Sequence, residues 1–184
     1  MIDQAEKLLR DGQPVPAIAL LTQHLVLNPG DQRALLLRAV TLMQMEQMHE
    51  ALKDLDELIT IEPENLSNIL LRADILALDG QIENAIAAYV SILRRKPEAG
   101  NVVLRLGTLL QKSKRWAEAL TIYTEAIERM PDFAEAYMAR GAVKHHLKDL
   151  AGATEDLKQA LTLKPELADQ LEGSVAFFDK KRCH

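Results

Sequence analysis

The chain has 184 residues, of which 48% are hydrophobic and 27% are charged, and its formal net charge is −5. This composition is typical of a folded protein with a packed interior and excludes a wholly disordered chain. The negative balance argues against broad nucleic-acid binding, which requires a basic face, and the single cysteine excludes an internal disulfide framework.

From its first residues onward, the chain alternates helix-like stretches with short breaks. Apolar residues recur at helical spacing, and no period-2 alternation is present, so we expect helices and no strands. Pro14 and Pro16 fall in the first turn of the second predicted helix, where a missing amide hydrogen costs little. Turn-forming or polar residues predict breaks at Asp11-Gly12, Asp79-Gly80, Ser113-Lys114 and Lys148-Asp149.

Three columns of residues recur with a period of 34. Proline occupies the first column, at Pro29, Pro63, Pro97, Pro131 and Pro165. Alanine occupies the second, at Ala17, Ala51, Ala85, Ala119 and Ala153. The third holds only small residues, at Ala5, Ala39, Ala73, Gly107 and Gly141. The columns predict stacked helical hairpins, each ended by its proline, because a single hairpin cannot bury its apolar face alone.

The small residues predict where the two helices of a hairpin approach each other closely. We expect Ala119 to lie against Gly107, and Ala153 against Gly141. The column that contains Ala126 holds larger residues in the earlier blocks, namely His24, Leu58 and Ile92. Adjacent hairpins in the first half are therefore expected to pack further apart or at a changed angle.

These features resemble the tetratricopeptide repeat (TPR) family, whose repeats are 34 residues long. The block from Gly100 matches well, with Trp116, Ala119, Tyr123 and Pro131, and so does the block from Ala134. The resemblance implies an all-α fold, a right-handed α-solenoid (superhelix) of five antiparallel helix-turn-helix units plus a C-terminal capping helix. It implies one domain, 1–184, with repeats at about 1–31, 32–65, 66–99, 100–133 and 134–167 and the capping helix at about 168–178.

Several polar residues receive structural interpretations. Asp132 and Glu135 have the spacing of a capping box at the start of the last block. Three arginines, Arg38, Arg72 and Arg140, stand where leucine is usual in the family; their stems are expected to cover the helix seam while the charge reaches water. The pair Glu155-Asp156 is expected on an exposed helix face.

The motifs of enzymes and of cofactor or metal sites are missing from the sequence. It contains no glycine-rich phosphate loop, no paired-cysteine zinc spacing, no HExxH and no Gly-x-Ser-x-Gly. The adjacent His145 and His146 diverge by about 100° on a helix and cannot bind one ion together. We therefore expect no enzyme activity, no cofactor and no metal.

The family resemblance implies a protein–protein interaction module, an adaptor that binds a peptide or protein segment in a concave groove lined by the first helices. The implied groove residues are Leu36, Leu37, Val40, Met43, Leu70, Leu71, Asp74, Asn101, Leu104, Arg105, Thr108, Lys112, Met138 and His145. The apolar zone next to the donors of Asn101, Arg105 and Lys112 favours a partner with an apolar anchor and an acidic residue.

A subset of the family binds the C-terminal carboxylate of chaperones with a fixed set of Lys, Asn and Arg residues. Here Asn101 and Arg105 match that set, whereas Leu36, Val40 and Leu71 stand where Lys and two Asn are required. The resemblance therefore does not extend to chaperone-tail binding.

An alternative function is a structural or self-assembling scaffold piece, including a fragment of a larger TPR protein. Self-association into a homo-oligomer could use the open first hairpin or Phe177. The start of the chain lacks the pattern of a secretory signal, and no apolar run reaches the roughly 18 to 20 residues that span a bilayer. We therefore expect a cytoplasmic protein without membrane insertion.

Overall fold

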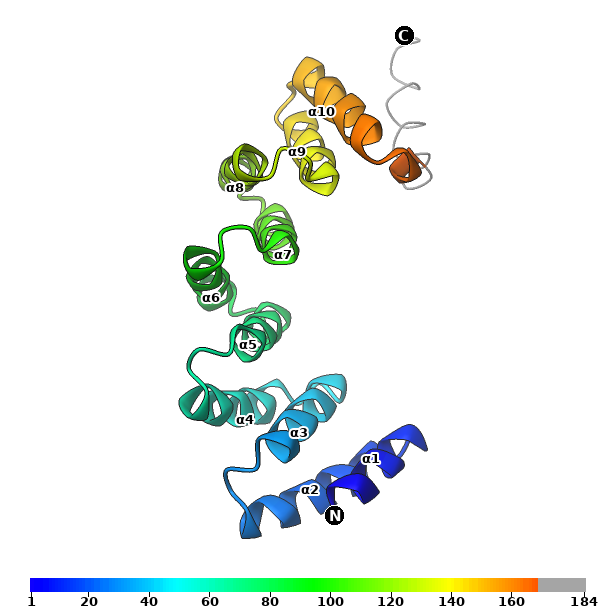
Figure 1. Cartoon of the computed structure of the whole chain (residues 1–184), viewed down its shortest axis with the longest axis vertical. Coiled ribbons are helices and arrows are strands. Elements are labelled where there is room, and N and C mark those ends of the chain that lie inside the picture. Colours follow the sequence, from blue (N-terminus) through cyan, green and yellow to red (C-terminus); the bar gives the residue numbers. More distant parts are fainter. Residues whose placement is uncertain (169–184) are drawn as a thin grey trace. The chain divides into compact units, whose positions relative to one another are not determined.

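The structure of the chain is a computed structural model, which describes residues 1 to 168. In these residues it contains helices and no strand (Figure 1). The α-helices are α1 (Ile2–Arg10), α2 (Pro14–Leu27), α3 (Gln32–Gln44), α4 (Met48–Ile61), α5 (Leu66–Leu78), α6 (Ile82–Arg95), α7 (Gly100–Lys112), α8 (Trp116–Arg129), α9 (Ala134–His146) and α10 (Leu150–Leu163). A short 3₁₀ helix, Pro165–Leu167, follows them. The predicted capping helix lies outside the described residues, apart from Ala168.

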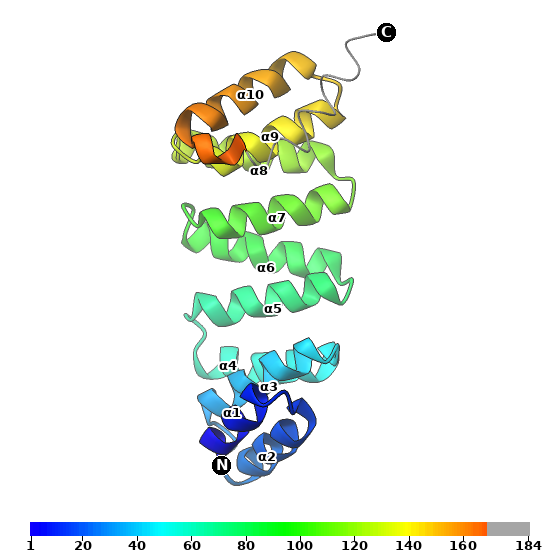
Figure 2. The ribbon, with the colours of Figure 1, turned by 90° about the vertical axis from the view of Figure 1, so that its right-hand side faces the viewer.

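The α-helices form five antiparallel pairs, which confirms the predicted architecture of helix-turn-helix units (Figure 2). The first helices of the second to fifth pairs begin at residues 32, 66, 100 and 134. The pairs gather into two compact units, Met1–Ile92 (unit 1) and Leu93–His184 (unit 2), and α6 crosses the boundary between them. The single domain over the whole chain stays a prediction.

One residue in each hairpin turn adopts the left-handed conformation. These residues lie 34 positions apart and have φ between 59° and 79°: Gly12, Glu46, Gly80, Lys114 and Lys148. In the first turn, the amide of Gly12 donates to the Leu9 carbonyl at 3.1 Å, and the amide of Gln13 donates to the Leu8 carbonyl at 2.8 Å. This Schellman pattern satisfies the last carbonyls of the first helix.

The second helix of each pair ends two residues before the repeated proline, which disfavours helical angles in the residue before it. The next first helix is capped in different ways. Asp31 caps α3, because its carboxylate accepts a hydrogen bond from the Ala34 amide at 3.0 Å. The predicted capping box at Asp132 is wrong. The residue before α9 is Phe133, so Asp132 lies one position too early, and Glu135 instead pairs with Lys164 at 2.7 Å.

The alanine and small-residue columns are buried between the helices, and all eight alanines that they contribute up to Ala153 are at most 1% exposed. A Cβ added at Gly141 would lie 3.2 Å from the Ala153 carbonyl oxygen, which confirms the predicted close approach there. The atoms nearest to a Cβ added at Gly107 belong to the ring of Tyr123, and the contact of Gly107 with Ala119 stays a prediction. Gln111 donates to the Tyr123 hydroxyl at 2.9 Å and holds the ring beside Gly107.

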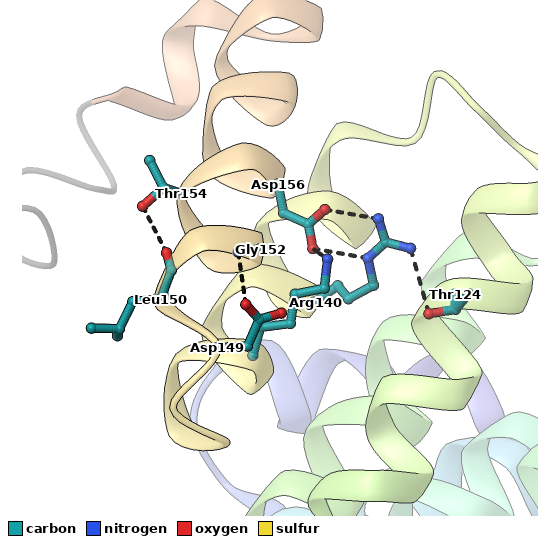
Figure 3. Close-up of polar contacts among 8 residues, drawn as sticks. Thr124, Arg140, Asp149, Leu150, Gly152, Thr154 and Asp156 are labelled. Carbon is teal, nitrogen blue, oxygen red and sulfur yellow. Dashed lines mark hydrogen bonds and ion pairs between the residues drawn. The ribbon is translucent and has the colours of Figure 1, made fainter.

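Two of the three repeated arginines form ion pairs with buried aspartates, so their charges are directed into the hairpin and not chiefly to water as expected; the arginine side chains are 20% and 15% exposed. Arg38 donates to both carboxylate oxygens of Asp54 at 2.8 and 2.6 Å, and Arg140 does so to Asp156 at 2.8 and 2.7 Å (Figure 3). Both aspartates are only 3% exposed. The prediction that Asp156 lies on an exposed face is therefore wrong. The third arginine, Arg72, pairs at 2.6 Å with the more exposed Asp56.

Opposing effects act on the Asp156 carboxyl. Burial raises the pKa of Asp156, but hydrogen bonds from Arg140 and Lys144 outweigh this and hold it below its ordinary value. Lys144 Nζ lies 2.9 Å from the carboxylate. The charge-assisted bonds thus fasten α9 to α10 across the interior of the hairpin.

Candidate functional site

Helix α3 has one side in the core and an apolar side at the surface. Leu35, Ala39 and Leu42 are at most 4% exposed and face the interior. The predicted groove residues of α3 occupy the other helical positions, and each keeps part of its side chain exposed: Leu36, Leu37, Val40 and Met43. Leu36 is the most open of them, at 40% exposure.

Helix α5 carries two further apolar residues of this kind in the same unit. Leu70 and Leu71 are half-buried, and Figure 1 shows α3 and α5 on the same side of unit 1, with α4 on the other. We call the surface formed by these two helices the apolar face; its residues are Leu36, Leu37, Val40, Met43, Leu70 and Leu71. The predicted groove residue Asp74 accepts a hydrogen bond from the Tyr89 hydroxyl at 2.6 Å, so its carboxylate stabilises its own hairpin.

The surface of α7 in unit 2 is polar and basic. Asn101, Arg105 and Lys112 are exposed and share one helical side, which we call the cationic face. The exposed Thr108 also lies on this side and hydrogen-bonds the Tyr123 hydroxyl. Leu104 is half-buried among them.

The two predicted groove residues of α9 have local partners. Met138 packs against the buried cluster of Ala134, Ala160 and Leu167, so part of its side chain belongs to the core of the last hairpin. The ring of His145 meets His146 edge-on, with the ring centroids 6.4 Å apart. All fourteen predicted residues keep some exposure, and none is buried. That the apolar and cationic faces form one groove stays a prediction.

The structure also contains a surface cleft that the groove prediction did not include. This cleft of about 370 Å³ opens in unit 1 between α2 and α4, above the Arg38–Asp54 pair. Its lining residues come from α2, α3, α4 and the turn between α3 and α4, at the junction of the first two hairpins. The wider packing of these hairpins stays a prediction. The other charged residues of the cleft are Glu50, Lys53 and Glu57, so the lining has no strong preference for one sign of charge.

The described part of the chain holds neither a metal cluster nor a membrane span. Within residues 1 to 168, no group of three or more His, Cys, Asp or Glu side chains could hold a metal ion. None of the helices described there combines the length and the apolar character needed to cross a bilayer.

The comparison with protein families settles the origin of the 34-residue period. Models of the tetratricopeptide repeat match residues 76–143, and also residues 32–65 and 134–167. The chain belongs to the tetratricopeptide repeat family. Members of this family are typically protein-interaction modules, and the chain has this general character.

Solved structures of low sequence identity share the fold. MamA aligns with a TM-score of 0.75 and 18% identity, covering 90% of this chain and 96% of that chain. MamA 41-end from Desulfovibrio magneticus RS-1 aligns with a TM-score of 0.72 and 15% identity, covering 89% and 93%. YrrB, described as a TPR protein with an unusual peptide-binding site, aligns with a TM-score of 0.68 and 18% identity, covering 94% and 89%. No curated protein matches the sequence.

Proposed function

We propose that this TPR protein is an adaptor that binds a peptide or protein segment on the first helices of its hairpins. The observation that carries the proposal is the apolar face, where α3 and α5 keep six apolar side chains at the surface. Partly exposed apolar side chains gathered on one side of a folded unit are typical of interaction sites. The peptide-binding site of YrrB, a protein of the same fold, supports this assignment.

Each face favours a different part of a ligand. Burying one leucine-sized side chain against Leu37 and Leu71 supplies about 1.5–3 kcal/mol. On the cationic face, the Arg105 guanidinium can bind a carboxylate through two parallel hydrogen bonds, a geometry that lysine cannot reproduce. We therefore propose a segment with an apolar anchor for unit 1 and an acidic residue or free carboxylate for unit 2.

The apolar face is tested by capturing partners from cells of the source organism with the full chain. Leu71→Glu places a charge on the face and is expected to abolish capture without unfolding the protein, because Leu71 already reaches the surface. The control is Leu27→Glu, at a leucine that is 69% exposed on the second helix α2. Equal capture by wild type and Leu71→Glu would refute binding at this face. Capture of the chain itself would favour the alternative, a self-assembling scaffold.

The cationic face is tested separately. Arg105→Lys keeps the charge but loses the two-bond geometry, so the affinity for a captured partner is expected to fall about tenfold, equivalent to about 1.4 kcal/mol. The matched control is Arg129→Lys, at an exposed arginine on α8. If both substitutions have the same effect, a general electrostatic contribution accounts for the binding, and the specific role of Arg105 is lost.

A further inference from the structure

Two hairpin turns of unit 2 are held side by side by an aromatic contact. Trp116 is the first residue of α8, and His146 is the last residue of α9. Their rings stack with centroids 4.1 Å apart and an interplanar angle of 14°. Because Trp116 follows the α7–α8 turn and His146 precedes the α9–α10 turn, the stack brings these two turns together.

Each of these turns places a lysine where the backbone favours glycine. Lys114 has φ of 59° and Lys148 has φ of 69°, and both side chains are exposed. The same repeat position holds Gly12 and Gly80 in two turns of unit 1, where glycine adopts the conformation without a Cβ penalty. Lysines in a strained position of an exposed turn point to a role outside the fold.

Exposed apolar side chains accompany the lysines. Leu147 is 44% exposed and Leu150 is 57% exposed. Figure 3 shows the Leu150 side chain directed away from the Arg140–Asp156 pair that holds α9 to α10. The described part of unit 2 has three exposed large apolar residues, and only Leu163 lies elsewhere. The turns therefore combine positive charge with apolar surface.

Carboxylates close to these turns are already engaged. Asp149 accepts a hydrogen bond from the Gly152 amide at 2.9 Å and caps α10. Glu118 pairs with Arg115 at 2.6 Å. The charges of Lys114 and Lys148 are thus presented to the solvent next to an apolar surface and attract an anionic group.

We propose that this turn edge binds an acidic segment of a partner protein in which an apolar side chain lies between carboxylates. The turn edge consists of Lys114, Trp116, His146, Leu147, Lys148 and Leu150. The lysines attract the carboxylates, while the stacked rings and the leucines supply the seat for the apolar side chain. None of the six belongs to the apolar or cationic face, so the turn edge is a second surface, independent of the function proposed above.

A short peptide suits this edge better than an extended anionic surface. The whole chain carries a net charge of −5, which repels a membrane or a nucleic acid that contacts a wide area. A peptide bound within about 8 Å of the lysines is affected mainly by the local positive charge, because salt screens more distant charges.

The experiment uses the full chain and a synthetic peptide with one leucine between runs of glutamate. Trp116 is the only tryptophan, so its fluorescence reports binding at the turn edge without a label. We expect a saturable change in fluorescence, and at least tenfold weaker binding of the same peptide with serine in place of leucine. Lys114→Gly/Lys148→Gly should weaken binding at least tenfold while leaving the melting temperature unchanged or higher, since glycine suits the backbone at both positions.

Matched variants distinguish the turn edge from the first-helix faces and from a membrane-binding surface. Glu46→Gly, at the same turn position in unit 1, should leave peptide binding unchanged, and Leu150→Ser should weaken it at least threefold. Wild-type affinity in the double-lysine variant would overturn the proposal. So would binding to phosphatidylserine vesicles without binding to the peptide, which would identify a membrane-binding edge. Loss of the Trp116 response in Leu71→Glu or Arg105→Lys would place the peptide on the first-helix faces instead.

Discussion

The first helices of the two units share the same backbone arrangement but carry different side chains at their surfaces. In unit 1, the apolar face of α3 and α5 holds partly exposed leucine, valine and methionine side chains, whereas α7 of unit 2 presents Asn101, Arg105 and Lys112. The columns that hold each hairpin together are nevertheless the same in both units, with buried alanine, a small residue and a closing proline. The columns thus maintain the fold, and the positions between them determine what each unit can bind.

The hairpins also differ in the residues that join their two helices in the interior. The position of Arg38 and Arg140 holds the buried Leu106 in the hairpin of α7 and α8, and the position of Asp54 and Asp156 holds Ile122. The family scaffold therefore accepts either an ion pair or two apolar residues at this place. Stability measurements on matched variants can show what the ion pair contributes.

The largest effect is expected from breaking one ion pair. Asp156→Ala leaves Arg140, whose side chain is only 15% exposed, without its carboxylate, so the free energy of unfolding should fall by about 3 kcal/mol. Asp54→Ala should have an effect of similar size in unit 1. Denaturant unfolding of the full chain measures both, and hydrogen exchange should place the damage of each variant in its own unit.

The matched control replaces both partners. Arg140→Leu/Asp156→Ile copies the residues of the α7–α8 hairpin, and its stability should return to within about 1 kcal/mol of wild type or exceed it, because the arginine is removed together with its carboxylate. Lys144 also loses its partner, but its side chain is 20% exposed and its charge can turn to the solvent. A double variant as unstable as Asp156→Ala would show that the ion pair is required for the packing of α9 against α10.

The next effect distinguishes the two glycines of the small-residue column. Gly107→Ala would drive a methyl group into the ring of Tyr123, and we expect a loss of about 1–3 kcal/mol. Gly141→Ala meets its neighbours at 3.2 Å and beyond and gains helix propensity, so its effect should be smaller. The melting temperatures of the two variants, measured by thermal unfolding, should be lower for Gly107→Ala than for Gly141→Ala. Adding Tyr123→Leu should rescue Gly107→Ala, since the chain itself combines Ala39 with Leu55 at these positions.

Acid should weaken both units through depressed carboxyl groups. Hydrogen bonds from His24 and from the Ala34 amide hold the pKa of Asp31 below its ordinary value of 3.8, and the pKa of Asp156 is also lowered. The folded protein therefore binds these protons less readily than the unfolded chain. The resulting stability is complete above about pH 4 and is lost as the pH falls through the folded pKa values.

Unfolding measured from pH 6 to pH 2 tests this effect. Arg140→Leu/Asp156→Ile should lose less stability in acid than wild type, because it lacks Asp156, one of the carboxyl groups of unit 2 whose pKa is lowered. The same slope in both proteins would assign the acid sensitivity to other groups.

The smallest effect concerns the strained turns. Glu46→Gly, Lys114→Gly and Lys148→Gly each relieve a positive φ, which favours the folded state, while the added chain entropy of glycine opposes it; the net gain should be about 0.5–1 kcal/mol. Equal gains in both units would show that the turns differ in charge and not in backbone energetics. A loss of stability in any of the three would indicate that the side chain contributes to the fold.

The sequence predicted the helices well because the repeat multiplies each weak local signal five times. The sequence-based predictions were wrong where a side chain's role depends on the exact residue at which a helix begins, or on a partner that lies on another helix. Asp132 resembles a cap, yet α9 begins one residue later than a cap at that position requires. Asp156 resembles a solvated carboxylate, because its partner Arg140 lies on another helix, sixteen residues earlier. The same offset joins Arg38 to Asp54, and this recurrence was the available signal for the buried pairs.

The family pattern also served to predict which residues of the first helices form the binding faces. The family pattern identified the outward positions of the first helices, and the structure keeps all fourteen at least partly exposed. It could not show that Asp74 and Met138 have partners within their own hairpins, since those contacts depend on side-chain packing. The sequence also did not predict the stacking of Trp116 on His146, because the two residues lie on different hairpins.

Site-specific photo-crosslinking tests the central claim, that the first-helix faces bind a partner, most directly. A photoreactive amino acid at position 71 lies on the apolar face, and one at position 27 lies on the exposed end of α2. In cells of the source organism, the account predicts a crosslink from position 71 to a second protein and none to that protein from position 27. Crosslinking of that protein from position 27 alone, or only to another copy of the chain from position 71, would contradict it.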